Sequence, residues 1–182
     1  MSPKAFQTKE QLTEALFRRY RQAMMALAMS FMGNAHDADD VVQMAILKIM
    51  RNIDKIDDID SPRCKHFILV ITKNTALNEI SRNKNRKTVT ITPAEMVSII
   101  EPGFDSYTFG AKYGFGEELS EFLGQLKEVD RDILCLKYGD DYSNAEIGEI
   151  LDITEEAVRK RLSRARKRLG EIMEKGGESC RE

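Results

Sequence analysis

The final third of the chain carries the pattern that most restricts the fold: a short capped helix, a turn and a longer basic helix. Ser143 and Glu146 have the spacing of a capping box, in which each residue satisfies a backbone N–H of the other. That helix is expected to end near Leu151, and Thr154 opens the next one. In the second helix, apolar residues recur every three or four positions, at Val158, Leu162, Ala165 and Leu169. This arrangement predicts a helix-turn-helix.

The second helix of this pair is strongly basic. Residues 154–170 hold seven Lys and Arg against two Glu, a net charge of +5 in a chain whose net charge is -2. A helix fits the major groove of DNA, where its outer face reaches base edges and phosphates; the alternative is a solvated helix whose charges serve solubility. The residues expected to reach bases lie near its N-terminus: Glu156, Ala157, Arg159, Lys160 and Ser163. Four later cations are expected to contact backbone phosphate or a protein partner: Arg164, Arg166, Lys167 and Arg168.

The rest of the chain also favours helices. Apolar residues recur at helical spacing in three segments, over residues 9–32 and 37–52 and from Pro62 to about residue 87. Two further helices are expected later in the chain, over residues 117–127 and 129–138. Periodicity stops over residues 88–116, which hold two Pro and four Gly and are predicted to form a linker. Five aromatic residues in this linker either dock onto a partner or pack against the protein's own domains.

The predicted fold class is therefore all-α, with two small helical domains joined by a flexible linker and a helix-turn-helix in the second. The predicted boundaries are a first domain over residues 1–87, the linker over 88–116, the second domain over 117–175 and a tail over 176–182.

Acidic residues gather over residues 37–60, which hold seven Asp against three Lys and Arg. At the start of this segment, His36, Asp37, Asp39 and Asp40 allow three interpretations. They cap a helix, whose dipole favours negative charge there; they ligate a metal, which would need further ligands such as His66; or, with Gln43, they form a docking face for a basic protein. We expect neither a metal nor another cofactor.

Basic residues gather at the end of the third predicted helix, at Arg82, Lys84, Arg86 and Lys87. They either complement the helix dipole or follow a DNA backbone. Asn74 and Asn78 lie four residues apart on one face of the same helix, although Asn is a poor helix former. Base or phosphate contacts explain this spacing as well as structural hydrogen bonds do.

The three Cys stand far apart, at positions 64, 135 and 180, and no CxxC occurs, so neither a disulfide framework nor a zinc site is expected. Cys64 and Cys135 are expected to fill helix surfaces or cores. The N-terminus is polar, and no apolar run approaches the ~20 residues that span a bilayer. The sequence therefore predicts a cytoplasmic protein without membrane insertion.

Three segments, in this order, resemble the extracytoplasmic-function (ECF) group of bacterial RNA polymerase sigma factors. Residues 37–43, Asp-Ala-Asp-Asp-Val-Val-Gln, resemble the family's acidic helix start, D-A-E-D-V-V-Q-E. Residues 71–78, Ile-Thr-Lys-Asn-Thr-Ala-Leu-Asn, resemble its I-A-x-N-x-A-x-(D/N) stretch. Residues 158–166, Val-Arg-Lys-Arg-Leu-Ser-Arg-Ala-Arg, are similar to its recognition helix, V-K-S-R-L-x-R-A-R. The resemblance covers nearly the whole chain.

The resemblance implies a factor without catalytic residues that binds core RNA polymerase and directs it to promoter DNA. Polymerase would be bound through Asp37, Asp39, Asp40 and Gln43. The minus-ten promoter element would be opened and held through Phe67, Asn74, Asn78, Arg82, Lys84 and Arg86. The minus-thirty-five element would be read through Glu156, Ala157, Arg159, Lys160, Ser163 and Arg164. A regulatory anti-sigma factor, typical of the family, is a further expected partner.

The chain departs from the family at three places. It has Phe67 where the family often has Trp, and Met44 follows Gln43 where the family tends to have Glu. Residues 54–60 are unusually acidic. Because like charge near single-stranded DNA is unfavourable, these Asp side chains are expected to point away from DNA or to contact basic groups on a partner.

Other classes of protein are compatible with parts of the pattern. A stand-alone helix-turn-helix regulator explains the last helix but not the first three, and it would bind specific duplex DNA without polymerase. A metal-dependent phosphohydrolase would use His36, Asp37 and His66 and would hold a stoichiometric metal. A phage or plasmid regulator of the same fold would share the sigma mechanism.

Overall fold

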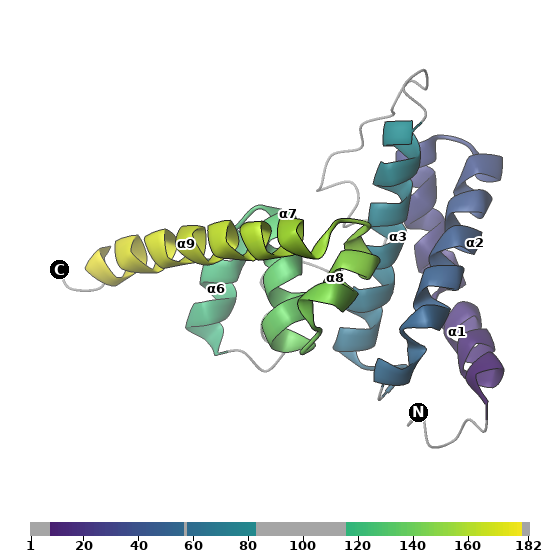
Figure 1. Ribbon diagram of the computed structural model, residues 1–182, viewed down its shortest axis with the longest axis horizontal. Coiled ribbons are helices and arrows are strands. Elements are labelled where there is room, and N and C mark those ends of the chain that lie inside the picture. The colour runs from purple at the N-terminus through teal and green to yellow at the C-terminus, as the bar shows by residue number, and fades with distance from the viewer. Residues whose placement is uncertain (1–7, 57, 83–115, 180–182) are drawn as a thin grey trace. The chain divides into compact units, whose positions relative to one another are not determined.

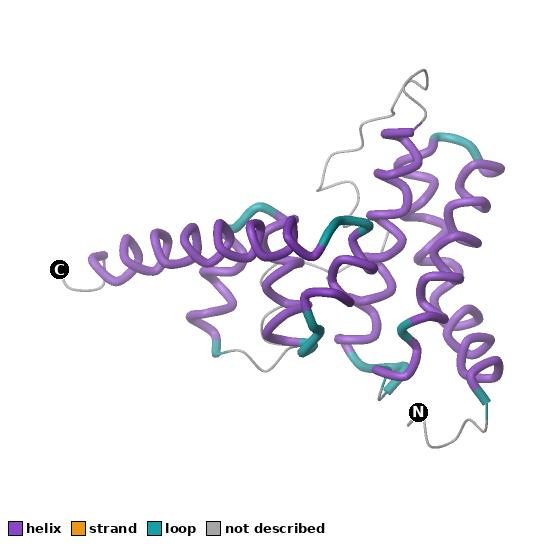
Figure 2. Tube along the Cα trace, in the orientation of Figure 1, coloured by secondary structure: helices purple, strands orange, loops and turns teal. Residues whose placement is uncertain are grey.

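The computed structural model describes residues 8–56, 58–82 and 116–179. These residues fold into helices joined by short turns, without a β-strand among them, and they belong to two compact units (Figures 1 and 2). The predicted all-α class with two helical domains is confirmed. The predicted linker lies outside the described residues except for Gly116.

The first unit is built from α1 (Lys9–Met32), α2 (Ala35–Arg51) and α3 (Pro62–Arg82), which pack against one another. Thr8 caps α1 by accepting a hydrogen bond from the Gln11 N–H, and Gly33 ends it in the left-handed region with φ 73°. The observed bounds of α1 are those predicted. Large apolar side chains from all three helices are fully buried between them, including Leu16, Met24, Val41, Ile49, Ile68 and Ile71.

The segment between α2 and α3 contains a 3₁₀ turn, η2 (Ile53–Lys55), and is bound to α1 by a hydrogen bond and ion pairs. The Tyr20 hydroxyl donates to the Ile59 carbonyl at 2.5 Å. Two of the acidic residues of this segment pair with cations of α1: Asp54 with Lys9 at 2.5 Å and Asp60 with Arg19 at 3.3 Å. These acids therefore neutralise charge within the unit, which the sequence did not predict.

The second unit contains α6 (Glu117–Gln125), α7 (Glu128–Leu134), η3 (Cys135–Gly139), α8 (Asn144–Leu151) as far as Glu149, and α9 (Glu155–Ser179). The helix predicted over residues 129–138 appears as α7 continued by one π-helical segment, η3. Both α6 and α7 pack against α9. The core of this unit includes Ile133, Leu136, Ile147, Val158 and Ala165.

Several helix boundaries differ from prediction; α6, for example, ends at Gln125 where residue 127 was predicted. The second helix begins earlier, at Ala35, because the Asn34 side chain caps it by accepting from the Asp37 N–H. The last helix continues past Gly176 and Gly177 to Ser179, where a tail was predicted. Glycine weakens a helix by roughly 1 kcal/mol relative to alanine, but unlike proline it retains the N–H donor that helical hydrogen bonds need.

The prediction that Cys64 and Cys135 fill helix surfaces or cores is confirmed. Cys64 and Cys135 are buried and free, and Cys180 lies outside the described residues. None of the described helices combines the length and the apolar character that crossing a bilayer requires.

Candidate functional site

The helix-turn-helix predicted from the sequence is formed by α8 and α9. Ser143 Oγ accepts from the Glu146 N–H at 3.3 Å, while the Glu146 carboxylate accepts from the Ser143 N–H at 2.7 Å, which is the predicted capping box. At the start of α9, Thr154 Oγ1 accepts from the Ala157 N–H at 3.2 Å. Both helices therefore begin at the residues that the sequence indicated.

The turn between the two helices is closed tightly against α8. The Ile153 N–H donates to the Gly148 carbonyl at 2.9 Å, and a Cβ at Gly148 would lie 2.7 Å from the Ile153 carbonyl oxygen. Asp152 stands in the turn with φ 51°. Glycine at position 148 thus permits the close approach that fixes where α9 begins.

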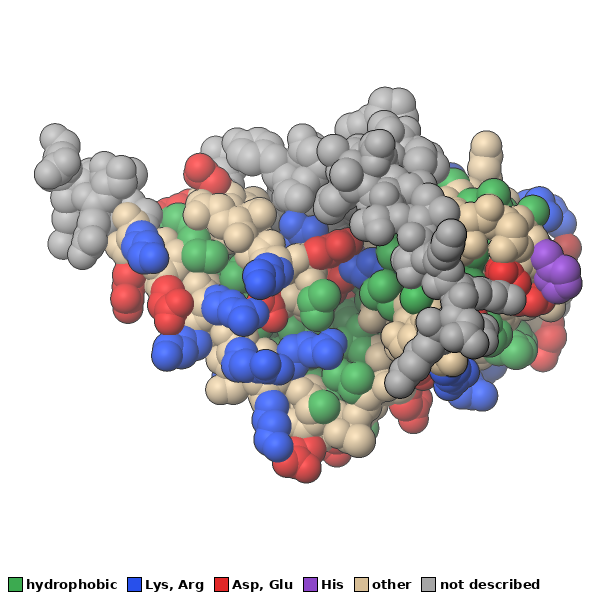
Figure 3. Space-filling view, turned by 90° about the horizontal axis from the view of Figure 1, so that it is seen from above, with side chains coloured by type: hydrophobic (Ala, Val, Ile, Leu, Met, Phe, Trp, Pro, Cys, Tyr) green, Lys and Arg blue, Asp and Glu red, His purple; other side chains and the backbone are tan. Residues whose placement is uncertain are grey.

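The two faces of α9 differ as predicted. Val158, Leu162 and Ala165 are buried, and Leu169 is half-buried. Of the residues expected to contact DNA, Ala157 is half-buried and the others are exposed: Glu156, Arg159, Lys160, Ser163 and Arg164. Lys and Arg side chains gather on the face of the second unit seen in Figure 3.

Two cations near the start of α9 are held by carboxylates one turn earlier. Arg159 Nη1 lies 2.7 Å from Glu155 Oε1, and Lys160 Nζ lies 2.7 Å from Glu156 Oε1. Exposed pairs of this spacing stabilise a helix by only a few tenths of a kcal/mol. Glu155 was not among the predicted site residues, although its position four residues before Arg159 was visible in the sequence.

Arg168 has a structural partner that the sequence did not reveal. Its guanidinium is paired with the carboxylate of Asp130 on α7, whose side chain is only 7% exposed. This ion pair ties the middle of α9 to α7, so Arg168 is engaged within the unit and does not extend freely toward phosphate. Arg166 Nη1 lies 3.5 Å from the Tyr138 hydroxyl of η3.

The acidic residues of α2 are organised in pairs. The Asn34 amide donates to the Asp37 carboxylate at 2.6 Å, so Asp37 takes part in the helix cap. The Gln43 amide donates to Asp39 at 2.6 Å. His36 Nδ1 lies 3.4 Å from Asp40; a backbone hydrogen bond, and then the charge of Asp40, raise the pKa of His36.

One row of side chains follows the solvent side of α2: Asp40, Gln43, Leu47 and Met50, which we call the α2 outer face. Leu47 is 59% exposed and Met50 is 37% exposed. Leu47 was not among the predicted site residues, although the sequence carried a signal for it, since it falls on the polar side of the helical period of α2. The predicted docking residues Asp40 and Gln43 thus lie in one row with two exposed apolar side chains.

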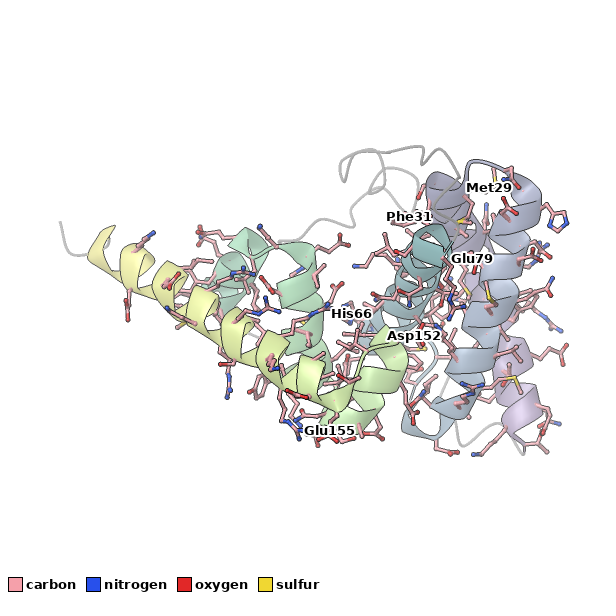
Figure 4. All side chains as sticks on the ribbon, turned by 45° about the horizontal axis from the view of Figure 1, so that its top comes forward. Met29, Phe31, His66, Glu79, Asp152 and Glu155 are labelled. Atoms are coloured by element: carbon pink, nitrogen blue, oxygen red, sulfur yellow. The ribbon has the colours of Figure 1, made fainter. Side chains whose placement is uncertain are left out.

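The structure places three possible metal ligands together. One ligand atom each from His36, Asp37 and Asp40 lies within 4.8 Å of the others, so this cluster could hold a metal ion. Such exposed acidic groups are common without a metal. His66, which the phosphohydrolase alternative requires, is buried on α3 and belongs to no ligand cluster of the described residues (Figure 4).

The residues expected to contact the minus-ten element differ in exposure. The Asn74 amide donates to the Val70 carbonyl at 2.9 Å, which favours the structural explanation for this Asn. Asn74 and Asn78 are half-buried and Arg82 is exposed, whereas Phe67 is only 2% exposed. Lys84 and Arg86 lie outside the described residues.

Comparison with known proteins gives matches over both units. The family model Sigma-70 region 2 matches residues 16–86, and the model Sigma-70, region 4 matches residues 116–169. The ECF RNA polymerase sigma factor SigW of Bacillus subtilis (strain 168) is 26% identical over 156 residues, which cover 82% of each chain. The RNA polymerase sigma factor SigV of the same strain is 25% identical over 163 residues, covering 87% of this chain and 92% of SigV. Among solved structures, CnrH in complex with the cytosolic domain of CnrY is 21% identical, with 91% and 89% of the chains covered and a TM-score of 0.33.

Proposed function

Because the chain belongs to the ECF sigma factors, which bind core RNA polymerase and direct it to promoters, we propose that its two units divide this task. The first, residues 1–87, docks on polymerase and opens the minus-ten element; the second, residues 117–175, reads the minus-thirty-five element; residues 88–116 link them. The observation that carries this proposal is the succession of a region 2 match on a three-helix unit and a region 4 match on a helix-turn-helix. A stand-alone regulator would account only for the second. The factor itself catalyses no covalent change.

Docking on polymerase is assigned to the N-terminal half of α2, through Asp37, Asp39, Asp40 and Gln43. Acidic groups at a rim steer a basic partner and raise the association rate, whereas buried apolar contacts supply more of the affinity. The α2 outer face offers both, because Leu47 lies one turn beyond Gln43 and is exposed. We therefore add Leu47 to the docking surface.

Opening of the minus-ten element is assigned to α3 and the residues that follow it. Asn74, Asn78 and Arg82 are at least partly accessible and carry hydrogen-bond donors, and Lys84 and Arg86 would extend the cationic path. Extruding a base costs a few kcal/mol, which polymerase binding has to offset. Since Phe67 is buried, stacking on an extruded base requires promoter binding to uncover its ring.

Reading of the minus-thirty-five element is assigned to α9, through Glu156, Ala157, Arg159, Lys160, Ser163 and Arg164. The buried stripe of Val158, Leu162 and Ala165 supports this assignment, because it fixes which face of α9 remains for DNA. A helix held in this way presents its first turns to base edges and its later cations to phosphate.

Two further parts of the proposal follow from the family. A sigma factor acts where polymerase meets the chromosome, so we place this protein in the cytoplasm. An anti-sigma factor would regulate it by covering the polymerase-binding faces, the α2 outer face among them.

The first test is binding to core RNA polymerase at moderate salt. We expect tight binding by the wild-type chain and much weaker binding by an Asp39→Lys, Asp40→Lys double variant. The matched control is Glu10→Lys, Glu14→Lys, which reverses two exposed acids of α1 and changes the net charge equally. It should bind like wild type, and circular dichroism should show both variants folded.

Three outcomes separate the parts of this proposal. Binding lost only in the α2 variant supports the function and the docking face. Binding retained in both variants keeps the function and refutes the docking face. Failure of folded, partner-free wild type to bind polymerase refutes the proposed division of roles and favours specific binding of duplex DNA by the chain alone.

A further inference from the structure

The start of α9 carries little net charge, although the helix as a whole is basic. Glu155 holds Arg159 and Glu156 holds Lys160, each across 2.7 Å. Both carboxylates lie in the first turn, where the helix dipole favours them, and Glu155 lies at the N-terminal end of α9 (Figure 4). The charges of two cations and two anions therefore cancel at the N-terminal end of α9, the end that is assigned to base reading.

The following turns have a different charge arrangement. Arg161 and Arg164 continue the basic sequence, and none of the carboxylates in the described part of the chain forms an ion pair with either. Positive charge that attracts phosphate is therefore concentrated beyond the first turn. The N-terminal turns of α9, in contrast, would gain little binding energy from phosphate. Their cations, Arg159 and Lys160, are restrained by the ion pairs with Glu155 and Glu156.

We propose that Glu155 is a specificity-determining residue, which orients Arg159 toward a base edge and keeps it from neutralising a phosphate. This inference rests on the proposed reading of the minus-thirty-five element by α9. The guanidinium has five N–H donors, and the contact with Glu155 is made through Nη1. Its other donors remain able to form the paired contact that guanine O6 and N7 accept, so the base read is a guanine.

Two physical effects favour this role. An arginine that is already restrained loses less side-chain freedom when it binds a base. A carboxylate at the protein–DNA boundary also repels phosphate, which lowers affinity for every sequence and leaves the favourable base contact as the main source of discrimination. A Glu155 that merely stabilised α9 would influence its melting and leave the choice of base unchanged.

The test uses holoenzyme formed from the full chain and core RNA polymerase, transcribing a promoter library randomised across the minus-thirty-five region. Sequencing the transcripts gives the preference at each base pair for wild type, Arg159→Ala and Glu155→Gln. The matched control is Glu171→Gln, because Glu171 faces Lys167 at 3.9 Å on the same helix, away from the reading end.

We expect Arg159→Ala to lower the preference for one G·C pair by about 5- to 150-fold, the range for a lost two-bond base contact. Glu155→Gln should lower the preference at the same pair by roughly three- to tenfold, while binding to non-specific duplex DNA strengthens and its salt dependence steepens by about one phosphate contact. Glu171→Gln should leave the base preference unchanged.

Two results would overturn the inference. If Glu155→Gln keeps the full preference at the pair that Arg159 reads, Glu155 has no role in specificity, while the sigma assignment stands. If wild-type holoenzyme initiates but shows no preference in the minus-thirty-five region, both the assignment of α9 and the role of Glu155 are wrong.

Discussion

Replacing Gly148 with Val tests how closely the turn of the helix-turn-helix approaches α8. A Cβ at this position would lie 2.7 Å from the Ile153 carbonyl oxygen, whereas ordinary contact begins at 3.4 Å. The obstructing atom belongs to the backbone and stands just before Thr154, the residue that caps α9. The two groups must therefore separate by about 0.7 Å, the difference between these distances, and this moves the start of α9.

The expected cost follows from two opposing effects. Overpacking a buried position costs roughly 1–3 kcal/mol, and the two methyl groups of Val enlarge the overlap. Replacing glycine within a helix returns only about 0.4 kcal/mol, because β-branched residues are themselves poor helix formers. We therefore expect a net loss of about 1–3 kcal/mol in the local stability of α8 and α9.

Native-state hydrogen exchange read by mass spectrometry measures this loss by segment. Peptides from α8 and α9 should exchange about 5- to 150-fold faster in Gly148→Val, while α1–α3 remain unchanged as an internal reference. Gly170→Val is the matched control, since a Cβ at Gly170 meets nothing within 4 Å. Exchange that is unchanged or slower in Gly148→Val would refute the reasoning, because the turn would then have room for a side chain.

Three other perturbations have defined outcomes. Arg168→Met leaves Asp130 as a buried charge without its partner; since Arg168 is half-exposed, we expect a loss of about 1–3 kcal/mol in urea unfolding, partly recovered by adding Asp130→Asn. Burial raises the pKa of Cys64 to about 12, so iodoacetamide near neutral pH should modify this thiol only in unfolded protein, and rapid labelling of native protein would contradict its burial. A backbone hydrogen bond and Asp40 raise the pKa of His36, so its ion pair with Asp40 is present below the unfolded-state pKa and is lost as pH rises through the folded-state value. Polymerase binding should therefore weaken as pH falls from about 8 to 6, because protonated His36 offsets the acidic charge of the docking face, and His36→Gln should remove this dependence.

Much of the fold was predictable because its determinants are local. Helical periodicity and the capping residues Thr154 and Ser143 depend on neighbours within one or two turns, so they can be read from sequence. The π-helical segment at residues 135–139 could not be predicted in the same way, since a single turn is too short for its apolar period to be distinguished from that of an ordinary helix. Its hydrogen bonds depend on how α7 packs.

The candidate sites were predictable only in part, because exposure is decided by tertiary packing. Phe67 and Asn74 both lie on α3 and were both expected to contact the minus-ten element, yet the ring of Phe67 is buried and the Asn74 amide is bonded to its own helix. Leu47 shows the converse case, an apolar residue that the fold leaves exposed. For Phe67 and Asn74 the residue type and spacing indicated a candidate, whereas Leu47 was not one; for all three, packing between helices decided whether the side chain was accessible.

Charge along α9 shows why counting residues gives an incomplete account of its DNA-binding face. The sequence assigns seven cations to residues 154–170, but ion pairs hold four of them, through two acids inside that window and two outside it. Asp130 is the most consequential of these acids, because it lies on another helix and no local pattern connects it with Arg168. The cations that no described carboxylate pairs with are Arg161, Arg164 and Arg166. They lie beyond Lys160, so long-range attraction to phosphate acts mainly there. Under the proposed role of α9, the paired cations before them serve discrimination, and the Arg168–Asp130 pair after them holds the helix in place.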